Sequence, residues 1–150
     1  MRVWRLARKP FLALDGEGAR LAGGRWNSEG VAVVYTSSTL SLAALEYLVH
    51  IDPEDVPEDL MVVGVEVPDG AAIDEVRLED LPADWNRVFD HPRCVAIGNE
   101  WIAAGKSLGL RVPSALVPEE WNLLLNPAHR DAQSVRVREK RRFVFDRRLL

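Results

Sequence analysis

The sequence predicts an α+β fold in a single domain that spans residues 1–150. Two observations support this prediction. Short apolar runs typical of strands outnumber the helical patterns, and the two kinds of segment do not alternate with the regular rhythm of a parallel sheet. A length of 150 residues suits one domain with a core of its own. We therefore expect a compact domain around a mixed or mostly antiparallel sheet.

The first fifty residues are expected to form two strands, a loop and a helix. Residues 3–6 alternate as in a short strand, whereas residues 15–30 are rich in glycine and charge, which is typical of a loop. Residues 31–35 form an apolar run typical of a buried strand. Hydroxyl residues at 36–39 then supply an N-cap for a helix that extends to about Ile51.

The spacing within this helix predicts which side faces the core. Leu42, Leu45 and Val49 share one face at helical spacing, so we expect that face to be buried. Glu46 falls beside Leu42, at the edge of the apolar face. A carboxylate in that position is partly desolvated, which costs free energy unless the group is paired or functional.

The middle of the chain contains one clear strand between two irregular segments. Residues 52–59 are an acidic loop with prolines, and residues 61–67 are an apolar strand. Residues 68–94 show no regular pattern and are expected to be irregular. Residues 99–108 are predicted to be a short helix that Gly109 ends.

The C-terminal part is predicted to end in a hairpin. Residues 110–112 form a strand that leads into the Pro113-Ser114 turn. Apolar and charged residues alternate at 135–138, and a second alternation follows at 143–145. We interpret these two segments as the paired strands of a terminal hairpin.

Charge is unevenly distributed along a chain whose formal net charge is −4. Residues 52–84 carry twelve acidic residues against one arginine, whereas residues 134–150 carry seven basic residues against two acidic ones. The acidic stretch is typical of a solvated face, with a docking surface for a basic partner as the alternative. The basic tail has few interleaved aromatic residues, so we expect no direct nucleic-acid binding.

The composition also bears on the compartment and on metals. Cys94 is the single cysteine, which excludes an intramolecular disulfide and fits a reducing compartment. Residues 1–6 are too charged for the apolar part of a secretory leader, and no apolar stretch approaches the ~20 residues of a membrane helix. The three histidines lack metal-ligand spacing. We expect a cytoplasmic protein without a membrane or metal site.

Several residues have the chemistry needed to hold a dinucleotide and cleave its glycosidic bond. The arginines Arg5 and Arg25 can bind pyrophosphate through their forked donors. Tyr35, at the end of a strand, can stack on a flat ring or orient a ribose. Glu46 can stabilise an oxocarbenium-like sugar, and Ser114 can bind substrate or position the acceptor.

Four of these residues also have an ordinary structural interpretation. Arg25 follows two glycines and fits a surface turn, and Tyr35 fits a core tyrosine with a satisfied hydroxyl. Glu46 fits a structural ion pair, and Ser114 fits a plain turn serine. Local sequence leaves these alternatives open.

In their order along the chain, these motifs resemble the RES-domain family, which is named for an arginine, a glutamate and a serine. The resemblance covers nearly the whole sequence. Its blocks are Trp4-Arg5, Gly-Gly-Arg-Trp-Asn (23–27), Val-Val-Tyr-Thr-Ser-Ser (33–38), Ala-Leu-Glu (44–46), Gly-Asn-Glu-Trp (98–101), Val-Pro-Ser-Ala (112–115), Asn122, Asn-Pro-Ala-His (126–129) and Phe-Asp-Arg-Arg-Leu (145–149).

The resemblance implies a role for each matching residue. The catalytic residues that it implies are Arg25, Glu46 and Ser114. The residues that it implies for NAD binding are Arg5, Arg25, Trp26, Tyr35, Ser37 and Asn122. Some relatives carry a tyrosine directly after the first arginine, where this chain has Leu6. That departure leaves Tyr35 as the aromatic residue expected at the substrate.

Family membership implies the toxin of a bacterial type II toxin–antitoxin system, with a fold similar to ADP-ribosyltransferase toxins. NAD is the implied substrate, without a metal, and cleavage at the nicotinamide–ribose bond by hydrolysis or phosphorolysis is expected to arrest growth. The alternatives are a protein ADP-ribosyltransferase and a non-catalytic module that only binds its antitoxin. The implied partner is an Xre-type helix-turn-helix antitoxin, in a complex that allows a toxin homodimer.

Overall fold

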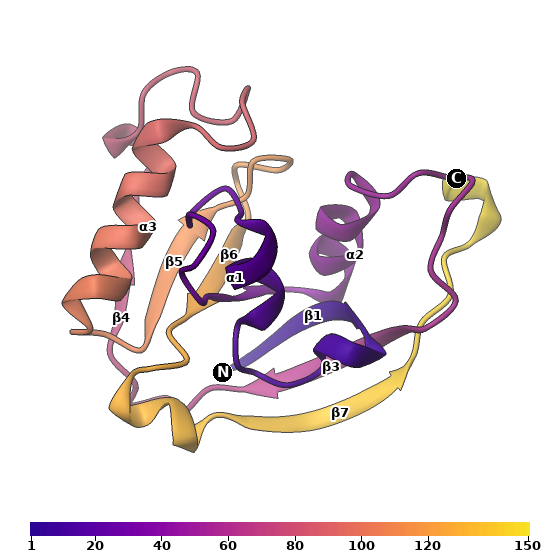
Figure 1. The fold of residues 1–150 in the computed structure, drawn as a ribbon, viewed down its shortest axis with the longest axis horizontal. Coiled ribbons are helices and arrows are strands. Elements are labelled where there is room, and N and C mark those ends of the chain that lie inside the picture. Colours follow the sequence, from indigo (N-terminus) through magenta and orange to yellow (C-terminus); the bar gives the residue numbers. More distant parts are fainter.

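The computed structural model describes residues 1–150 and contains one seven-stranded sheet with three α-helices (Figure 1). The strands are β1 (Arg2–Arg8), β2 (Val34–Ser37), β3 (Leu60–Glu66), β4 (Ile73–Glu75), β5 (Gly109–Pro113), β6 (Trp121–Leu125) and β7 (Arg136–Arg142). The helices are α1 (Glu17–Ala22), α2 (Leu40–Leu48) and α3 (Pro92–Ala104). Short 3₁₀ turns occupy Lys9–Phe11, Leu78–Asp80, Arg130–Ser134 and Arg147–Leu149.

The sheet is mixed, so the predicted α+β class is confirmed. Its order is β4-β5-β6-β2-β1-β3-β7, and β4 with β5 is the parallel pair among antiparallel neighbours. β1 pairs with β3 along its whole length but meets β2 only at Trp4 and Ser37. The two groups of strands therefore diverge at this point and run in different directions in Figure 1.

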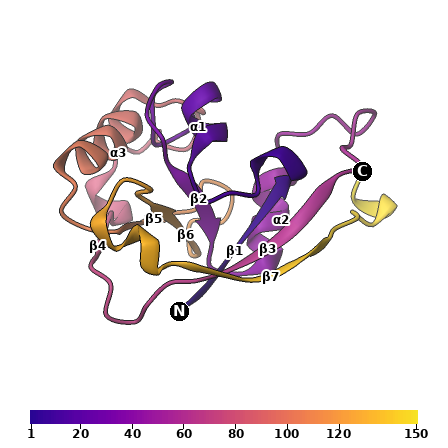
Figure 2. The same ribbon diagram turned by 60° about the horizontal axis from the view of Figure 1, so that its bottom comes forward.

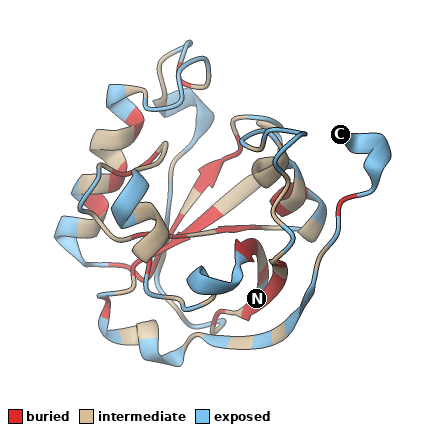
Figure 3. Ribbon diagram, turned by 45° about the vertical axis from the view of Figure 1, so that its right-hand side comes forward, coloured by how far each residue is buried: buried red, intermediate tan, exposed pale blue.

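The helices cover different parts of the sheet. α2 lies against β1 and the end of β2 and shares a side-chain cluster with β3, whereas α3 lies beside β4 and β5, as Figure 2 shows from a second side. The cluster near α2 contains Leu6, Leu60, Val62 and Phe145, and the cluster near α3 is built around three buried tryptophans, Trp26, Trp85 and Trp101. A third cluster of valines and leucines contains Val3 and Val63, which alternate with Leu6 and Val62 along their strands. Buried residues accordingly concentrate on the central strands in Figure 3.

The face of α2 differs from the prediction. Leu42 is buried, but Leu45 and Val49 are 44% and 55% exposed. The small residues Ala43 and Ala44 lie toward the protein instead. Because their side chains are small, the helix approaches the sheet closely. The helix ends at Leu48 rather than Ile51.

Several predicted segments need correction. The strand expected at 31–35 is β2 at Val34–Ser37, and residues 31–33 lie outside it. Residues 15–30 contain α1, which has only six residues, and residues 68–94 contain β4 and the start of α3. α3 begins at Pro92, with the His91 side chain accepting a hydrogen bond from the Arg93 N–H as its cap, and it ends at Ala104, followed by Gly105 in the left-handed conformation. Gly109 begins β5 instead of ending a helix. β6 was not predicted.

The predicted terminal hairpin is wrong. Residues 136–142 form one strand on β3, with a bulge opposite Gly64 and Val65, and residues 143–145 leave the sheet. Phe145 is buried and contacts the rings of Phe143 and Tyr47, so aromatic packing against α2 wins over strand pairing. β7 is an edge strand rich in arginine, which is a common protection against pairing with another chain.

The three α-helices are all too short or too polar to cross a membrane; the longest has 13 residues.

Candidate active site

The carboxylate of Glu46 is held by two side chains from distant parts of the sequence. Its Oε1 atom accepts a hydrogen bond from Ser114 Oγ at 2.7 Å and another from Asn122 Nδ2 at 2.6 Å. The other oxygen, Oε2, makes no hydrogen bond within the protein. Glu46 is half-buried, so one carboxylate oxygen is anchored and the other has no partner within the protein.

The fold brings these three residues together at the end of the β2 strand. The chain turns from β2 into α2 at Thr39, whose Oγ1 accepts a hydrogen bond from the Leu42 N–H at 3.1 Å and caps the helix. Ser37, the last residue of β2, lies opposite Asn122 of β6, and Ser37 Oγ donates to Asn122 Oδ1 at 2.7 Å. Helix α2 therefore starts next to the β2–β6 strand pair, whose Asn122 binds Glu46.

Ser114 also fixes the turn in which it lies. It is fully buried, and its Oγ accepts hydrogen bonds from the backbone N–H groups of Leu116 and Val117, both at 3.1 Å. These two donors occupy the lone pairs of the hydroxyl, so its own hydrogen is directed at Glu46. The serine thus has both a structural and a site-building role.

Arg25 holds the loop formed by residues 85–89 in place. Its Nη1 donates to the carbonyls of Trp85 and Val88 at 3.2 and 2.8 Å. The guanidinium carbon lies 5.8 Å from the ring centroids of both Trp85 and Phe89. Its Nε and Nη2 atoms make no hydrogen bond within the protein, so they remain available to an anion.

The loop at 85–89 connects Arg25 with the surroundings of Glu46. Asn86 Nδ2 donates to the carbonyl of Ala115, the neighbour of Ser114, at 3.3 Å. The Phe89 ring meets His50, just beyond the end of α2, edge-on at 5.1 Å. Arg25 and the Glu46 cluster therefore border the same loop from different sides. Residues 68–94 were expected to be irregular, and no periodic pattern in them indicated that residues 85–89 would lie beside Arg25 and the Glu46 cluster.

Tyr35 and Trp26 support the Gly23–Asn27 turn from behind. The Tyr35 hydroxyl donates to Asn27 Oδ1 at 2.6 Å and accepts from the Trp26 N–H at 3.0 Å. Burial raises the pKa of Tyr35 well above its usual range. Trp26 is 2% exposed, with its ring 6.2 Å from that of Trp85. The Trp26 ring is therefore covered, whereas Tyr35 is half-buried. Stacking of either side chain on a substrate ring stays a prediction.

Arg5 does not join the Glu46 cluster. Its guanidinium donates to the carbonyls of Phe11 and Ala13 at 3.1 and 3.4 Å. Burial lowers the pKa of Arg5, and Asp15 opposes this effect. Arg5 alternates with Leu6, which packs toward α2, so the two side chains leave opposite faces of β1.

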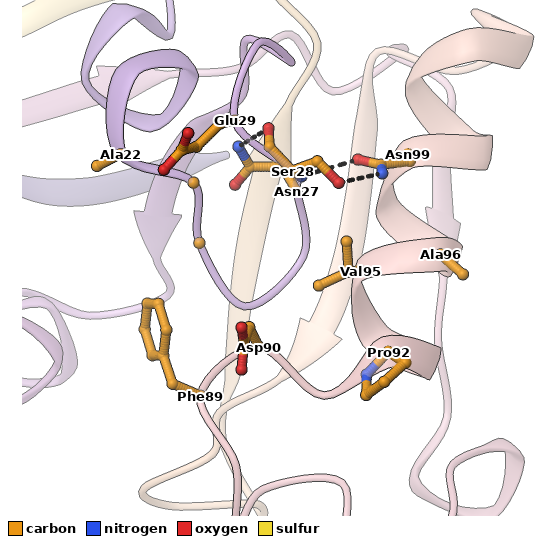
Figure 4. A pocket seen from close by; sticks show the side chains of 12 residues that line it. Ala22, Asn27, Ser28, Glu29, Phe89, Asp90, Pro92, Val95, Ala96 and Asn99 are labelled. Carbon is orange, nitrogen blue, oxygen red and sulfur yellow. Dashed lines mark hydrogen bonds between the residues drawn. The ribbon is translucent and has the colours of Figure 1, made fainter.

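A cavity of about 550 Å³ opens beside the glycines that precede Arg25 (Figure 4). Gly23 and Gly24 form one wall, and the start of α3 forms the other. Asn99 Nδ2 donates to Ser28 Oγ at 2.8 Å across this region, which ties α3 to the turn. Phe89 lines the cavity and also contacts Arg25, so the cavity is next to the arginine loop. No cluster of three or more His, Cys, Asp or Glu side chains has the arrangement of a metal site.

Comparison with known proteins supports the motif analysis. The model of the RES domain family matches residues 2–146. A protein named "Toxin Res" from Yersinia enterocolitica is 39% identical over 152 residues, covering 99% of both chains. A protein named "Prs ADP-ribosylating toxin" from Sphingobium sp. is 39% identical over 139 residues, covering 91% of this chain and 86% of the relative.

A solved structure supports the fold. The toxin–antitoxin complex MbcT-MbcA of M. tuberculosis contains a chain that superposes with a TM-score of 0.79 at 20% identity, covering 95% of this chain and 84% of the other. At this identity the likeness concerns the fold alone. The family match spans nearly the whole chain and includes Arg25, Glu46 and Ser114. This chain belongs to the RES domain family.

Proposed function

We propose that this protein is the toxin of a toxin–antitoxin pair and that it cleaves NAD at the nicotinamide–ribose bond. The observation that carries the proposal is the environment of Glu46, with Oε1 anchored by Ser114 and Asn122 and Oε2 free. A preorganised carboxylate of this kind suits a reaction in which positive charge develops on a sugar. Relatives named as toxins support the biological role.

The chemistry follows from the bond that breaks. As the bond from ribose C1′ to the nicotinamide nitrogen breaks, its electron pair leaves with nicotinamide, which becomes neutral. The positive charge moves to C1′ and the ring oxygen, where Glu46 Oε2 stabilises it or binds a ribose hydroxyl. Arg25 has free donors that offset the pyrophosphate charge. The acceptor then forms a bond to C1′ and loses a proton.

The acceptor decides between two enzyme activities. Water or phosphate as acceptor depletes NAD, and this is the activity that we propose. A protein side chain as acceptor makes the enzyme an ADP-ribosyltransferase, and the name of the Sphingobium relative favours this second candidate. Incubation of the purified protein with NAD, with and without phosphate or cell lysate, followed by mass analysis of the products, distinguishes them. NAD that stays intact under all these conditions would refute both.

The toxic effect is tested in cells. Expression in a bacterial host is expected to arrest growth, and Glu46→Gln or Arg25→Ala is expected to relieve the arrest at equal protein level. If the protein is a non-catalytic module, Glu46→Gln and Arg25→Ala are expected to affect growth to the same extent as the native protein. The hydrogen bonds of Glu46 with Ser114 and Asn122 argue against that alternative, because a toxin without catalytic activity does not require an oriented carboxylate.

We propose an Xre-type helix-turn-helix protein as the antitoxin, in a complex that allows a toxin homodimer. A carboxylate of the antitoxin near Arg25 would occupy the phosphate-binding donors, since arginine forks accept both groups. The acidic stretch at 52–84 offers a secondary docking surface. Co-purification of the two proteins, followed by an NAD assay of the complex, tests this mechanism. Turnover at the rate of the free toxin would show that neutralisation does not occur at the active site.

A further inference from the structure

We infer that Asn122 is a positioning residue that orients Glu46, with Ser37 fixing the orientation of the asparagine amide. This inference rests on the proposed function and assigns a different task to two residues otherwise expected to bind NAD. The structure links the three side chains in a row, Ser37 to Asn122 to Glu46, through hydrogen bonds of 2.7 and 2.6 Å.

Both ends of the Asn122 amide are occupied within this row. Oδ1 accepts from Ser37 Oγ, and Nδ2 donates to Glu46 Oε1. An amide rotated by half a turn would place its oxygen against the carboxylate, where two acceptors repel each other. The Ser37 hydroxyl opposes that rotation because it donates to Oδ1. Ser37 is 4% exposed, so water does not readily replace it.

The strands make the row rigid. Asn122 lies in β6 between β2 and β5, where it is paired with Ser37 on one side and with Val112 on the other. Glu46 is carried by α2, which starts three residues after Ser37. A displacement of Glu46 relative to the sheet would therefore break the contact with Asn122. The amide donor thus holds Oε1 in place and leaves Oε2 as the oxygen that meets the substrate.

The sharpest test is Asn122→Asp, which keeps the size of the side chain and replaces the amide donor with a carboxyl group. At neutral pH the new carboxylate lies against Glu46 and repels it, so nicotinamide release is expected to fall by about 10²-fold, the typical effect of a displaced catalytic group. At acidic pH the two neighbouring carboxyl groups share one proton. The introduced carboxyl group can then again donate a hydrogen bond to Glu46. The deficit relative to the native protein is therefore expected to shrink as the pH falls.

Two further variants separate positioning from folding. Asn122→Ala is expected to lower kcat at every pH, with no recovery at acidic pH, because alanine cannot donate. Thr36→Val is the matched control, since Thr36 precedes Ser37 in β2 and its Oγ1 donates to the Leu123 carbonyl at 2.7 Å, away from Glu46. This control is expected to keep the native pH profile. A constant deficit of Asn122→Asp across the pH range, or native kcat in Asn122→Ala, would overturn the inference.

A readout independent of catalysis tests the contact itself. The side-chain amide resonances of Asn122, observed by NMR in the native protein and in Glu46→Gln, are expected to differ and to change with pH only while Glu46 is present. Identical, pH-independent resonances in both proteins would refute the contact. Absence of NAD turnover in the native protein, with the NMR result as expected, would refute the proposed function but retain the Asn122–Glu46 contact.

Discussion

The replacement Glu46→Gln removes one charge from the candidate site and almost nothing else. The glutamine oxygen can take the place of Oε1 and accept from Ser114 and Asn122, because both partners are donors. The glutamine NH₂ group then lies where Oε2 was, and no protein group hydrogen-bonds to that atom. The variant therefore keeps the shape of the site and places a donor where the proposed mechanism needs a negative charge.

The expected effects on stability and rate differ in size. A hydrogen bond to a charged group contributes about 1.5–3 kcal/mol and a neutral one about 0.5–1.5 kcal/mol, so two bonds that each weaken by about 1 kcal/mol lower the free energy of unfolding by about 2 kcal/mol. For a chain of this length that corresponds to a fall in Tm of about 4–8 °C. Loss of one preorganised electrostatic contact lowers the rate by about 10²–10³, or roughly 2.7–4 kcal/mol of barrier.

The assay is the initial rate of nicotinamide release from NAD by native and variant proteins, with thermal unfolding measured on the same samples. Glu54→Gln is the matched control, because Glu54 is an exposed residue of the acidic loop and its carboxylate makes no ion pair. It is expected to keep the native rate. If folded Glu46→Gln releases nicotinamide at the native rate, the carboxylate does not stabilise the transition state and the reasoning fails.

Three further perturbations test the surroundings of the site. In Arg25→Lys, the lysine cannot reproduce both hydrogen bonds of the arginine to the 85–89 loop. Faster hydrogen exchange in that loop and slower NAD turnover are therefore expected. Unchanged exchange would show that Arg25 does not hold the loop in place. Tyr35→Phe leaves Asn27 Oδ1 and the Trp26 N–H unpaired and is expected to cost about 1–3 kcal/mol of unfolding free energy. Because burial raises the pKa of Tyr35, the stability that its neutral form contributes is complete below the unfolded-state value of about 10 and falls as the pH rises above it, so Tyr35→Phe should show a flatter decline in alkaline denaturation than the native protein. Gly98→Ala would place its Cβ 1.6 Å from the Trp26 carbonyl oxygen, so a loss of about 3 kcal/mol or more is expected in chemical denaturation; a native midpoint would show that α3 can move away from the turn.

Local patterns in the sequence determined much of the fold class and most of the candidate site. The apolar runs at 31–35 and 61–67 predict strands because a strand that is buried on both faces appears in the sequence as a continuous apolar run. The helix that carries Glu46 was predicted from its cap and periodicity, although the wrong face was assigned to the core. The family motifs pointed to Glu46, Ser114 and Asn122, which the structure joins by hydrogen bonds.

The elements that the sequence did not predict are those that the tertiary structure stabilises. α1 has six residues, too few for a stable isolated helix, and β4 has three residues and exists through its pairing with β5. Residues 143–145 alternate like a strand but leave the sheet, since Phe145 gains more from burial near α2. Such choices depend on what the rest of the chain places nearby.

The decisive geometry of the site is also tertiary. Glu46 is separated from Ser114 by 68 residues and from Asn122 by 76, and neither spacing contains information on which oxygen each partner binds. The same holds for Tyr35, whose hydroxyl is committed to Asn27 and the Trp26 backbone rather than left open for a ligand. The sequence alone determined which chemical groups the protein has. Only the sheet and its helices decided which groups meet, because hydrogen bonds require distances and directions that residue identity does not contain.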